Sequence, residues 1–516
     1  SMLWPSTTEK RMIAELGINH DGSMETAATM INALAHGGVG YIKLQYRNIN
    51  RVYSTTGGGL KELGDEIVGE ELRRTSLSSQ QQSELLALGH SLGLKVGISF
   101  FDVQDVYDFG PGINDFDFFK VPSAELGNRE LLDVLLKLDR LVLISTGGHT
   151  EAQISEALGR VESYENWIPL HAVMNYPTAH HNAQLGYLKH LLDKWRRPVG
   201  YSSHDADWEV CLVAAALGAT IIERHVTHSK TASGLDHSSS SDIMEALKLW
   251  RLLEAFQDLH RCPDERFPNQ GELMNLQNLG RSYYARDAMD SGTRVARADF
   301  DYRVPRRGFG PLEAQQVWGL PLKHAIHVGD ALGAGDFEDT ARVSKTLVAW
   351  ADQNLVGIPV RPRDWRLLTE TLPVRTREFH LSYQDVRGGL SADGLSSLCN
   401  YSVHLPDYVN ATHLLNPFSV EPDIREESQT VLHSCMNFAR ELQELSGSAV
   451  PVVGSFSSGL GDSRESFYEG QRELVEAWNR SSVALVHQWL PPYAWYFGGS
   501  VPIERFNSLE DLELCI

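Results

Sequence analysis

Lys43 and Lys120 each lie near the end of a short apolar run, a position that predicts burial. A buried lysine costs several kcal/mol unless an anion meets it, and a structural salt bridge would satisfy either lysine alone. Two such lysines with several hydroxyl groups nearby favour a bound anion with many oxygens, a phosphate or a carboxylate. The hydroxyl groups that follow or end neighbouring runs are those of Ser99, Ser123, Ser145 and Ser202.

His204 and His225 end two consecutive apolar runs. If these runs are adjacent strands, about 4.8 Å apart, both imidazoles can reach one ion. Two histidines with oxygen ligands suit a first-row divalent metal in an open site, and two separate core histidines are the alternative. No third histidine or thiol obviously joins the pair, which argues against a closed structural zinc site.

The elements that must position these side chains are short apolar runs separated by helix-like stretches. Eight strands alternating with helices over about 250 residues predict an α/β fold, a (β/α)8 TIM barrel, with a doubly wound open sheet as the rival. Asn128 and Thr150 have the residue types and positions of helix N-caps. The runs are Met12–Gly17, Gly40–Gln45, Lys95–Phe101, Phe116–Ser123, Arg140–Thr146, Trp167–Met174, Pro198–His204 and Thr220–Thr227.

Catalytic groups of a β/α barrel lie at the carboxyl ends of its strands. The predicted strand ends and the loops after them therefore supply further candidates. Glu125 and Asp236 are the carboxyl groups that we consider for proton transfer. Besides the residues named above, the polar side chains at these places are those of Glu15, Asn19, His20, Gln45, Glu125, Thr146, Asn175, Tyr176, Thr178, Glu223, Asp236 and His237.

The length of 516 residues leaves room for about three domains. We predict a TIM-barrel domain over residues 1–265, a linker and small β-rich module over residues 266–342, and a partial second β/α barrel over residues 343–516. The polar stretch Asp264–Glu272 is predicted as the linker. The expected strands of the last domain are Leu355–Val360, Glu378–Tyr383, Tyr401–Leu405, Ala449–Ser455, Val483–His487 and Leu512–Ile516.

The composition restricts the partners and the compartment. A net charge of −21 repels phosphate backbones, so we expect no nucleic-acid partner. No stretch approaches the ~20 apolar residues of a membrane helix, so no membrane association is expected. The five cysteines are widely spaced, and no basic segment followed by an apolar one opens the chain. Both features favour a cytoplasmic protein with reduced thiols.

Several sequence phrases resemble the sialic acid (N-acetylneuraminate) synthase family. They are AELGINHDGS (14–23), YIKLQ (41–45), FFKVPSAEL (118–126), ISTGG (144–148), NYPT (175–178), GYSSH (200–204), IIERHVT (221–227) and LDH (235–237). The resemblance covers about residues 12–340. It implies a transferase that condenses phosphoenolpyruvate with a hexosamine-type aldehyde, giving a nonulosonic acid and phosphate. Residues 278–340 resemble the antifreeze-like (SAF) domain of that family, which implies a domain-swapped homodimer.

The resemblance also implies roles for individual residues. Phosphoenolpyruvate would be held by Lys43, Ser99, Lys120, Ser123, Ser145 and Ser202. His204 and His225 would bind the metal, most often manganese, with magnesium or cobalt as alternatives. The sugar and the reacting carbon would be surrounded by Gln45, Glu125, Tyr176 and Asp236, and Glu15 matches the glutamate that ends the first strand.

Three positions depart from the pattern of the family. Met174 stands where the family often has a substrate-binding asparagine; Asn175 follows, but a one-residue shift along a strand turns a side chain to the other face. Ser203 stands in place of an aspartate before the metal-binding histidine. Val304 occupies the place of an arginine that meets the acyl group of an N-acetylated sugar, and Arg303, Arg306 or Arg307 would have to replace it. N-acetylmannosamine is therefore not the expected acceptor.

Residues 345–516 weakly resemble the sugar phosphate isomerase/epimerase barrels, through FHLSY (379–383), YSVHLPDY (401–408) and AWYFGGS (494–500). Gly454 and Ser455 stand where such barrels commonly place a glutamate, so a sugar-binding or assembly role is at least as well supported as catalysis. For the first domain, two other functions stay open. One is a Schiff-base pyruvate aldolase that uses Lys120, and the other is a non-catalytic sugar-binding scaffold.

Overall fold

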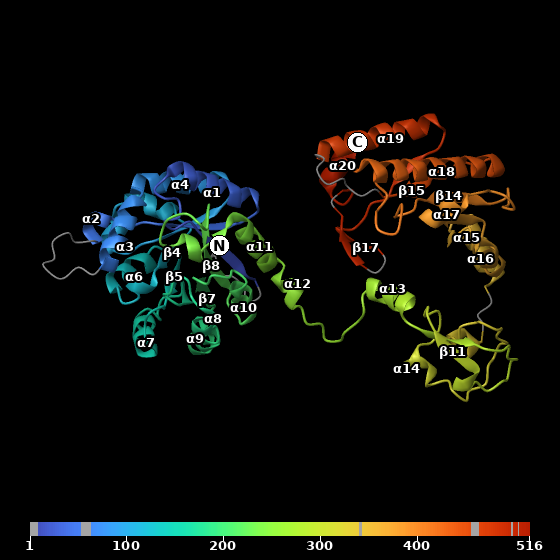
Figure 1. The fold of residues 1–516 in the computed structure, drawn as a ribbon, viewed down its shortest axis with the longest axis horizontal. Helices are drawn as coiled ribbons and strands as arrows, with labels where there is room; N and C mark the ends of the chain where they lie inside the picture. Colours follow the sequence, from blue (N-terminus) through green and yellow to red (C-terminus); the bar gives the residue numbers. More distant parts are fainter. Residues whose placement is uncertain are drawn as a thin grey trace. The chain divides into compact units, whose positions relative to one another are not determined.

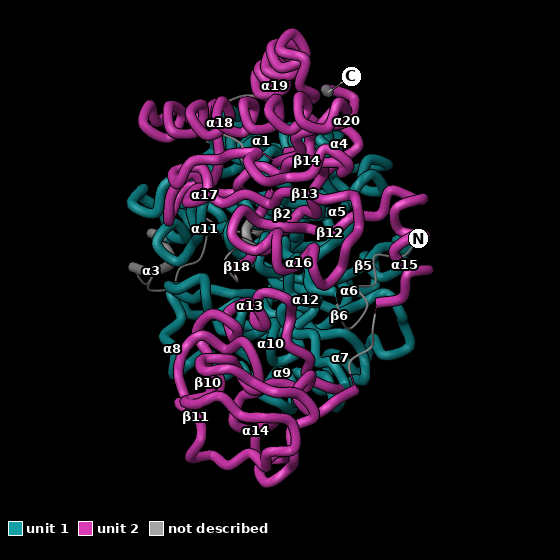
Figure 2. Tube along the Cα trace, turned by 90° about the vertical axis from the view of Figure 1, so that its right-hand side faces the viewer, with its two compact units in different colours: residues 1–264 teal, residues 265–516 magenta. Residues whose placement is uncertain are grey.

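The computed structural model describes residues 9–52, 63–339, 343–455, 464–496, 499–503 and 505–515. The chain divides into two compact units, residues 1–264 and 265–516, drawn in teal and magenta in Figure 2. The first unit is a closed barrel of eight parallel strands with helices outside, as predicted (Figure 1). The barrel strands are β1 (Arg11–Glu15), β2 (Tyr41–Gln45), β3 (Lys95–Ser99), β4 (Phe118–Val121), β5 (Leu141–Ser145), β6 (Trp167–Ala172), β7 (Gly200–Ser203) and β8 (Ile221–Thr227).

The helices of the first unit pack apolar faces against the outward side chains of these strands. Asn128 and Thr150 are helix N-caps, as predicted, because each side chain accepts a hydrogen bond from the backbone of the first turn. The helices are α1 (Met24–His36), α2 (Ile49–Val52), α3 (Leu63–Arg74), α4 (Ser79–Ser91), α5 (Val103–Tyr107), α6 (Arg129–Leu136), α7 (Glu151–Arg160), α8 (His180–Ala183), α9 (Tyr187–Trp195), α10 (Val210–Ala216), α11 (Ile243–Glu254) and α12 (Phe256–His260). The short strand β9 (Ser241–Asp242) pairs with β8.

The interior of the barrel changes from apolar to polar along each strand, because every second residue points inward. Its amino-terminal end is filled by a buried cluster that includes Ile13, Phe118 and Ile221. Two residues further along the same strands come Glu15, Lys120 and Glu223, all buried. The strands therefore carry their own floor of apolar side chains beneath a layer of charges.

Gly97 shows how tightly this floor is packed. A Cβ atom at Gly97 would lie 2.2–2.4 Å from ring atoms of Phe118 on the neighbouring strand. Only glycine leaves room there for the phenyl ring, which fills the barrel axis below Lys120.

The second unit contains a small β-rich module and a five-stranded parallel sheet with helices. The module holds the antiparallel pair β10 (Ser282–Ala285) and β11 (Phe300–Arg303) and α14 (Pro311–Ala314) around its own apolar cluster, and α13 (Gln270–Leu279) precedes it in the chain. The predicted linker is shorter than expected, because Asn269 caps a helix that already begins at Gln270. Gly271 is therefore helical.

The sheet of the second unit has the order β12-β13-β14-β15-β16. Its strands are β12 (Ile358–Val360), β13 (Thr376–His380), β14 (Asn400–His404), β15 (Val452–Gly454) and β16 (Leu485–His487), and the hairpin β17 (Tyr493–Tyr496) and β18 (Gly499–Pro502) follows. The helices are α15 (Lys345–Gln353), α16 (Trp365–Thr371), α17 (Tyr383–Gly388), α18 (Pro422–Ser446), α19 (Arg464–Arg480) and α20 (Leu509–Cys515).

The strand expected at Leu512–Ile516 is wrong. Those residues belong to α20, apart from Ile516, which lies outside the described residues. Asp511 accounts for the helix: its carboxylate accepts backbone hydrogen bonds from Asn507 and Ser508 and pairs with Arg464 of α19. Across the described part of the chain, no helix is long and apolar enough to cross a membrane.

Candidate active site at the carboxyl end of the barrel

A pocket of about 210 Å³ opens at the carboxyl ends of the barrel strands. It brings together side chains that are up to 221 positions apart in the sequence, because each strand contributes its last inward residues. Most of the predicted site residues line it: Glu15, Lys43, Gln45, Ser99, Lys120, Ser123, Ser145, Tyr176, His204, His225 and Asp236.

The two lysines form a compact cluster with two glutamates. The Lys43 ammonium donates to Glu15 Oε1 and to Ser99 Oγ, each at 2.5 Å, and lies 3.6 Å from Glu223 Oε1. Lys120 contacts the same oxygen of Glu223 and donates to Ser202 Oγ at 3.1 Å. Two positive and two negative charges thus balance in a layer that is at most 5% exposed.

The register of the strands explains this cluster. Glu15 pairs with Lys43 on one side and with His225 on the other, and Ser99 pairs with Lys120. Burial alone would raise the pKa of Glu15, but Lys43 and Lys120 outweigh it and bring that pKa to about 2. Burial lowers the pKa of Lys120, and Glu223 only partly opposes this shift.

His204 and His225 face each other, with ring centroids 5.7 Å apart. His204 Nδ1 lies 2.7 Å from the carbonyl oxygen of Val173, so this nitrogen carries the proton and Nε2 keeps its lone pair. Burial, and to a smaller extent the neighbouring His225, lowers the pKa of His204 to about 3. Burial also lowers the pKa of His225, to about 4. Both rings are neutral near pH 7, the form that binds metals.

The pair fits a divalent cation. Two imidazoles that share an ion at roughly 2.1 Å have centroids about 5–6 Å apart, as here. His225 Nδ1 is buried without a hydrogen-bond partner among the described residues, so no hydrogen bond competes with a metal ion for this nitrogen. Gly17, at φ +53°, passes this nitrogen closely; a Cβ there would lie 3.2 Å from it. Glu15 and Asp236 carboxylates lie 3.3 and 3.9 Å from the His225 ring nitrogens.

Asp236 and Tyr176 form the outer wall of the pocket. Burial raises the pKa of Asp236, with His225 opposing the rise. Burial and then the charge of Asp236 raise the pKa of Tyr176, whose ring packs 4.3 Å from that of His204. A carboxyl group with a raised pKa beside an imidazole is suited to exchanging protons with a bound molecule.

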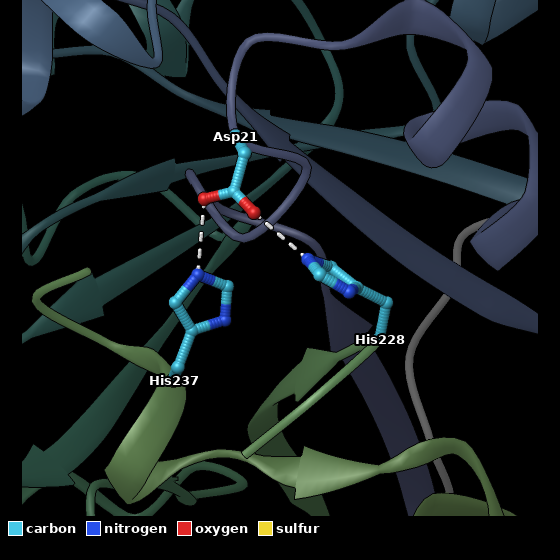
Figure 3. Close-up of side chains that lie close together, drawn as sticks. All are labelled: Asp21, His228 and His237. Carbon is cyan, nitrogen blue, oxygen red and sulfur yellow. Dashed lines mark hydrogen bonds and ion pairs between the residues drawn. The ribbon is translucent and has the colours of Figure 1, made fainter. Parts of the chain in front are cut away.

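A second cluster of ionisable groups, drawn in Figure 3, lies in the loops that carry Asp236. The Asp21 carboxylate contacts His228 Nε2 at 2.8 Å and His237 Nε2 at 3.0 Å. These three residues have the spacing of a metal site. The guanidinium of Arg74 also donates to Asp21 at 3.0 Å, and this positive charge opposes a bound cation. Asp21 therefore links three segments: the loop after β1, which carries it, the loop after β8, and the end of α3.

Two predicted site residues lie outside the lining of the pocket. Ser202 sits behind it and supports Lys120. Glu125 lies in a 3-10 helix after β4, half-buried, and its carboxylate accepts a hydrogen bond from Asn128 at 2.9 Å. Sequence reasoning noted Glu223 at a strand end but gave it no role, and it missed Arg47, which lines the pocket with its guanidinium 3.5 Å from the Phe101 ring centre.

Met174, Asn175 and Tyr176 follow the end of β6. Tyr176 lines the barrel pocket, Asn175 lines a separate pocket beside it, and Met174 lines both. A second signal that could have identified this region is the pair Gly147–Gly148 after β5, over which Met174 packs.

The loop of the small module holds the arginines considered as replacements for the arginine absent at Val304. Val304 itself is half-exposed. The Arg303 guanidinium lies 4.9 Å from the centre of the Tyr284 ring, and Arg306 pairs with Glu313 at 2.6 Å. Arg307 is exposed.

The barrel is similar to known proteins of one family. Residues 30–262 match the model of the NeuB family. An N,N'-diacetyllegionaminic acid synthase of Legionella pneumophila is 26% identical, over 62% of this chain and 92% of the relative. An N-acetylneuraminate-9-phosphate synthase of Mus musculus is 28% identical, over 62% and 90%. A pseudaminic acid synthase of Campylobacter jejuni is 26% identical, over 64% and 98%.

Proposed function

Because residues 30–262 are a NeuB family domain, we propose that this barrel condenses phosphoenolpyruvate with the aldehyde form of an amino sugar, giving a nonulosonic acid and phosphate. The observation that carries the proposal is the pocket itself. Two buried lysines, two neutral histidines that fit a metal, and a carboxyl group of raised pKa converge on one cavity. The names of the three relatives, all synthases of acids of this class, support it.

Phosphoenolpyruvate carries a carboxylate and a phosphate, and the donors of the pocket complement both. Lys43 and Lys120 supply the charge, with the hydroxyls of Ser99, Ser123 and Ser145 around them. Ser202 holds Lys120 in place. Glu15 and Glu223 balance the lysines before the anion arrives, so the buried layer never carries two unpaired positive charges.

His204 and His225 would hold a divalent cation, which we take to be manganese. Such a cation would polarise the oxygen of the aldehyde when bound. The Val173 carbonyl fixes the tautomer of His204, and Gly17 leaves space beside His225. Glu15 and Gln45 lie on the adjoining strand ends, where they would orient the reacting groups.

The chemistry balances with one water molecule. C3 of phosphoenolpyruvate attacks the aldehyde carbon, water adds at C2, and phosphate leaves with cleavage of the C2–O bond. Asp236 is placed to exchange a proton with the aldehyde oxygen, and Tyr176 closes the pocket beside it. Glu125 would act on the acceptor only after its side chain turns away from Asn128, which now donates a hydrogen bond to its carboxylate.

One observation favours a second candidate, a Schiff-base aldolase. Burial lowers the pKa of Lys120, as is typical of lysines that attack carbonyl groups. The contact with Glu223 opposes this role, because it keeps the amine protonated. Reduction with borohydride in the presence of pyruvate would leave a covalent adduct on Lys120 if the aldolase were the true activity.

We also propose that the protein is a cytoplasmic homodimer in which the small module of one chain covers the barrel pocket of its partner. Its support is the resemblance of that module to an antifreeze-like domain and the exposed loop around Val304. Mixing a His204→Ala chain with a chain that lacks residues 278–340 should recover activity. Heterodimers that form without any recovery would contradict the exchange.

The test of the proposed reaction is release of phosphate from phosphoenolpyruvate that depends on both manganese and an amino sugar. The assay should compare a panel of hexosamines and their deoxy analogues. A His204→Ala chain is the matched negative control, and His36→Ala, at the exposed end of α1, is the matched positive one. Phosphoenolpyruvate that stays intact with every sugar would refute the proposal.

A further inference from the structure

A second pocket of about 490 Å³ lies beside the barrel pocket, on the same end of the barrel. It is formed by the ends of β5 and β6 and by α7, α8 and α9. Met174 lines both pockets, and among the residues that the structure describes it is the one that they share. The polar side chains of the second pocket that matter here are those of His149, Asn175, Asn182 and Gln184.

Met174 packs against the backbone of Gly147 and Gly148, where no side chain stands in its way. A Cβ atom at Gly147 would be 3.1 Å from Met174 Cγ, and one at Gly148 would be 2.8 Å from its Sδ. Gly148 also has φ +73°, a conformation that favours glycine. The methionine side chain is 40% exposed and flexible, so it can turn away when a ligand occupies both pockets.

The size of the barrel pocket makes such a ligand reasonable. Pockets for small molecules commonly measure about 300–1,000 Å³. At 210 Å³ the barrel pocket falls below that range, yet the proposed reaction needs it to hold two substrates. The second pocket falls within the range and adjoins the barrel pocket at Met174.

The lining of the second pocket suits a neutral, hydrogen-bonding group. Asn175, Asn182 and Gln184 offer carboxamides, which both donate and accept hydrogen bonds. Among the described residues of the lining, the carboxylate is that of Glu151, which is already bound by Lys194 and Tyr187, at 2.6 and 2.5 Å. An acylamino group presents an N–H and a carbonyl oxygen, and it complements carboxamides without adding charge.

We propose that the acceptor spans both pockets, with its aldehyde end in the barrel pocket and a neutral acylamino substituent at its far end in the second pocket. Met174 at the divide is then a specificity-determining residue. This inference rests on the proposed function, because it assigns the second pocket to the acceptor of that reaction.

The experiment compares two acceptors that differ only in the far substituent, a mono-N-acetylated hexose and its di-N-acetylated counterpart. The ratio of their kcat/KM values is measured for the full-length protein and for Asn182→Ala, Met174→Ala and Met174→Leu. We expect the di-N-acetylated sugar to be preferred. Loss of one hydrogen bond in Asn182→Ala should lower the ratio about three- to tenfold.

Met174→Ala should change the ratio, whereas Met174→Leu, which conserves volume, should keep it within about twofold. The exposed Asn114, which precedes the amino-terminal end of β4 and lines neither pocket, provides the matched control, Asn114→Ala; its side-chain amide donates to the carbonyl of Pro111. The KM for phosphoenolpyruvate should stay unchanged in Asn182→Ala and Asn114→Ala, because neither residue lines the barrel pocket. A ratio that neither Asn182→Ala nor Met174→Ala alters would overturn the inference.

A binding measurement separates this inference from the proposed reaction. Saturation-transfer NMR reports which sugar the full chain binds, whether or not phosphate is released. Preferential binding of the di-N-acetylated sugar that Asn182→Ala abolishes would support the second pocket even if no turnover occurred. Equal binding of both sugars in every variant would overturn it, even in an active synthase.

Discussion

Glu223 is the residue whose change tests the charge layer most sharply. It contacts Lys120 and lies 3.6 Å from Lys43, and all three side chains are almost fully buried. Glu223→Gln keeps the shape and one hydrogen-bond acceptor but leaves the layer with one unbalanced positive charge. Breaking a buried ion pair from one side costs about 3–5 kcal/mol, so we expect the barrel to lose stability of that order.

The same change should strengthen the binding of phosphoenolpyruvate. A charge pair about 4 Å apart is worth about 4 kcal/mol at an effective dielectric of 20, and the anion no longer competes with Glu223 for the lysines. If a third of that energy is realised, the dissociation constant falls about tenfold. Stability is followed by hydrogen exchange of barrel peptides in urea, and binding by calorimetry.

Glu156→Gln is the matched control, because Glu156 pairs with Arg160 on the exposed surface of α7. That pair should contribute less than about 1 kcal/mol, and its loss should leave binding unchanged. The reasoning fails if Glu223→Gln is as stable as the unchanged protein and its dissociation constant for phosphoenolpyruvate stays within twofold.

Three further outcomes are expected. In the absence of metal, the free energy of unfolding should fall as the pH drops from 6.5 towards 4. In this range His225 is protonated in the unfolded chain but stays neutral in the folded protein, where its pKa is about 4. His225→Gln should remove about 2 kcal/mol of that loss at pH 5, measured by hydrogen exchange; an unchanged pH profile would contradict it. Chelation should abolish phosphate release, and added manganese should restore it. Elemental analysis should show that His204→Ala loses bound manganese and that His237→Asn retains it. Loss of manganese in His237→Asn alone would place the metal at the Asp21 cluster instead. N-acetylmannosamine should be about ten- to a hundredfold poorer in kcat/KM than the best acceptor, because Val304 offers no charged donor; N-acetylmannosamine as the best acceptor, with alanine at Arg306 having no effect, would disprove this.

The barrel could be predicted because the same sequence pattern recurs in each of its strands. Each strand is a short apolar run that ends in polar residues, and the alternation along a strand places Ile13 and Glu15, or Phe118 and Lys120, on the same inward face. The strand ends were predicted within about two residues. The last element was missed because Leu512–Ile516 is too short to distinguish a strand from a helix by periodicity, and Asp511 decides the outcome through contacts with Arg464.

The residues of the candidate site were predicted better than the contacts between them. Parallel strand ends bring Lys43, Lys120, His204 and His225 to one edge, whatever the details. The partners of the lysines depend on the stagger between strands, which the sequence does not state, so the role of Glu223 was missed. The position of Met174 between the two pockets depends on a contact between two loops, and a single sequence contains no signal for that contact.

The proposed reaction is tested most directly by following the bridging oxygen of phosphoenolpyruvate. The substrate is labelled with ¹⁸O between C2 and phosphorus and incubated with the full chain, manganese and the best acceptor of the panel. We predict phosphate that carries the label, because the C2–O bond breaks, and a nine-carbon acid that forms in equal amount. Unlabelled phosphate, or phosphate release that does not depend on the sugar, would contradict it.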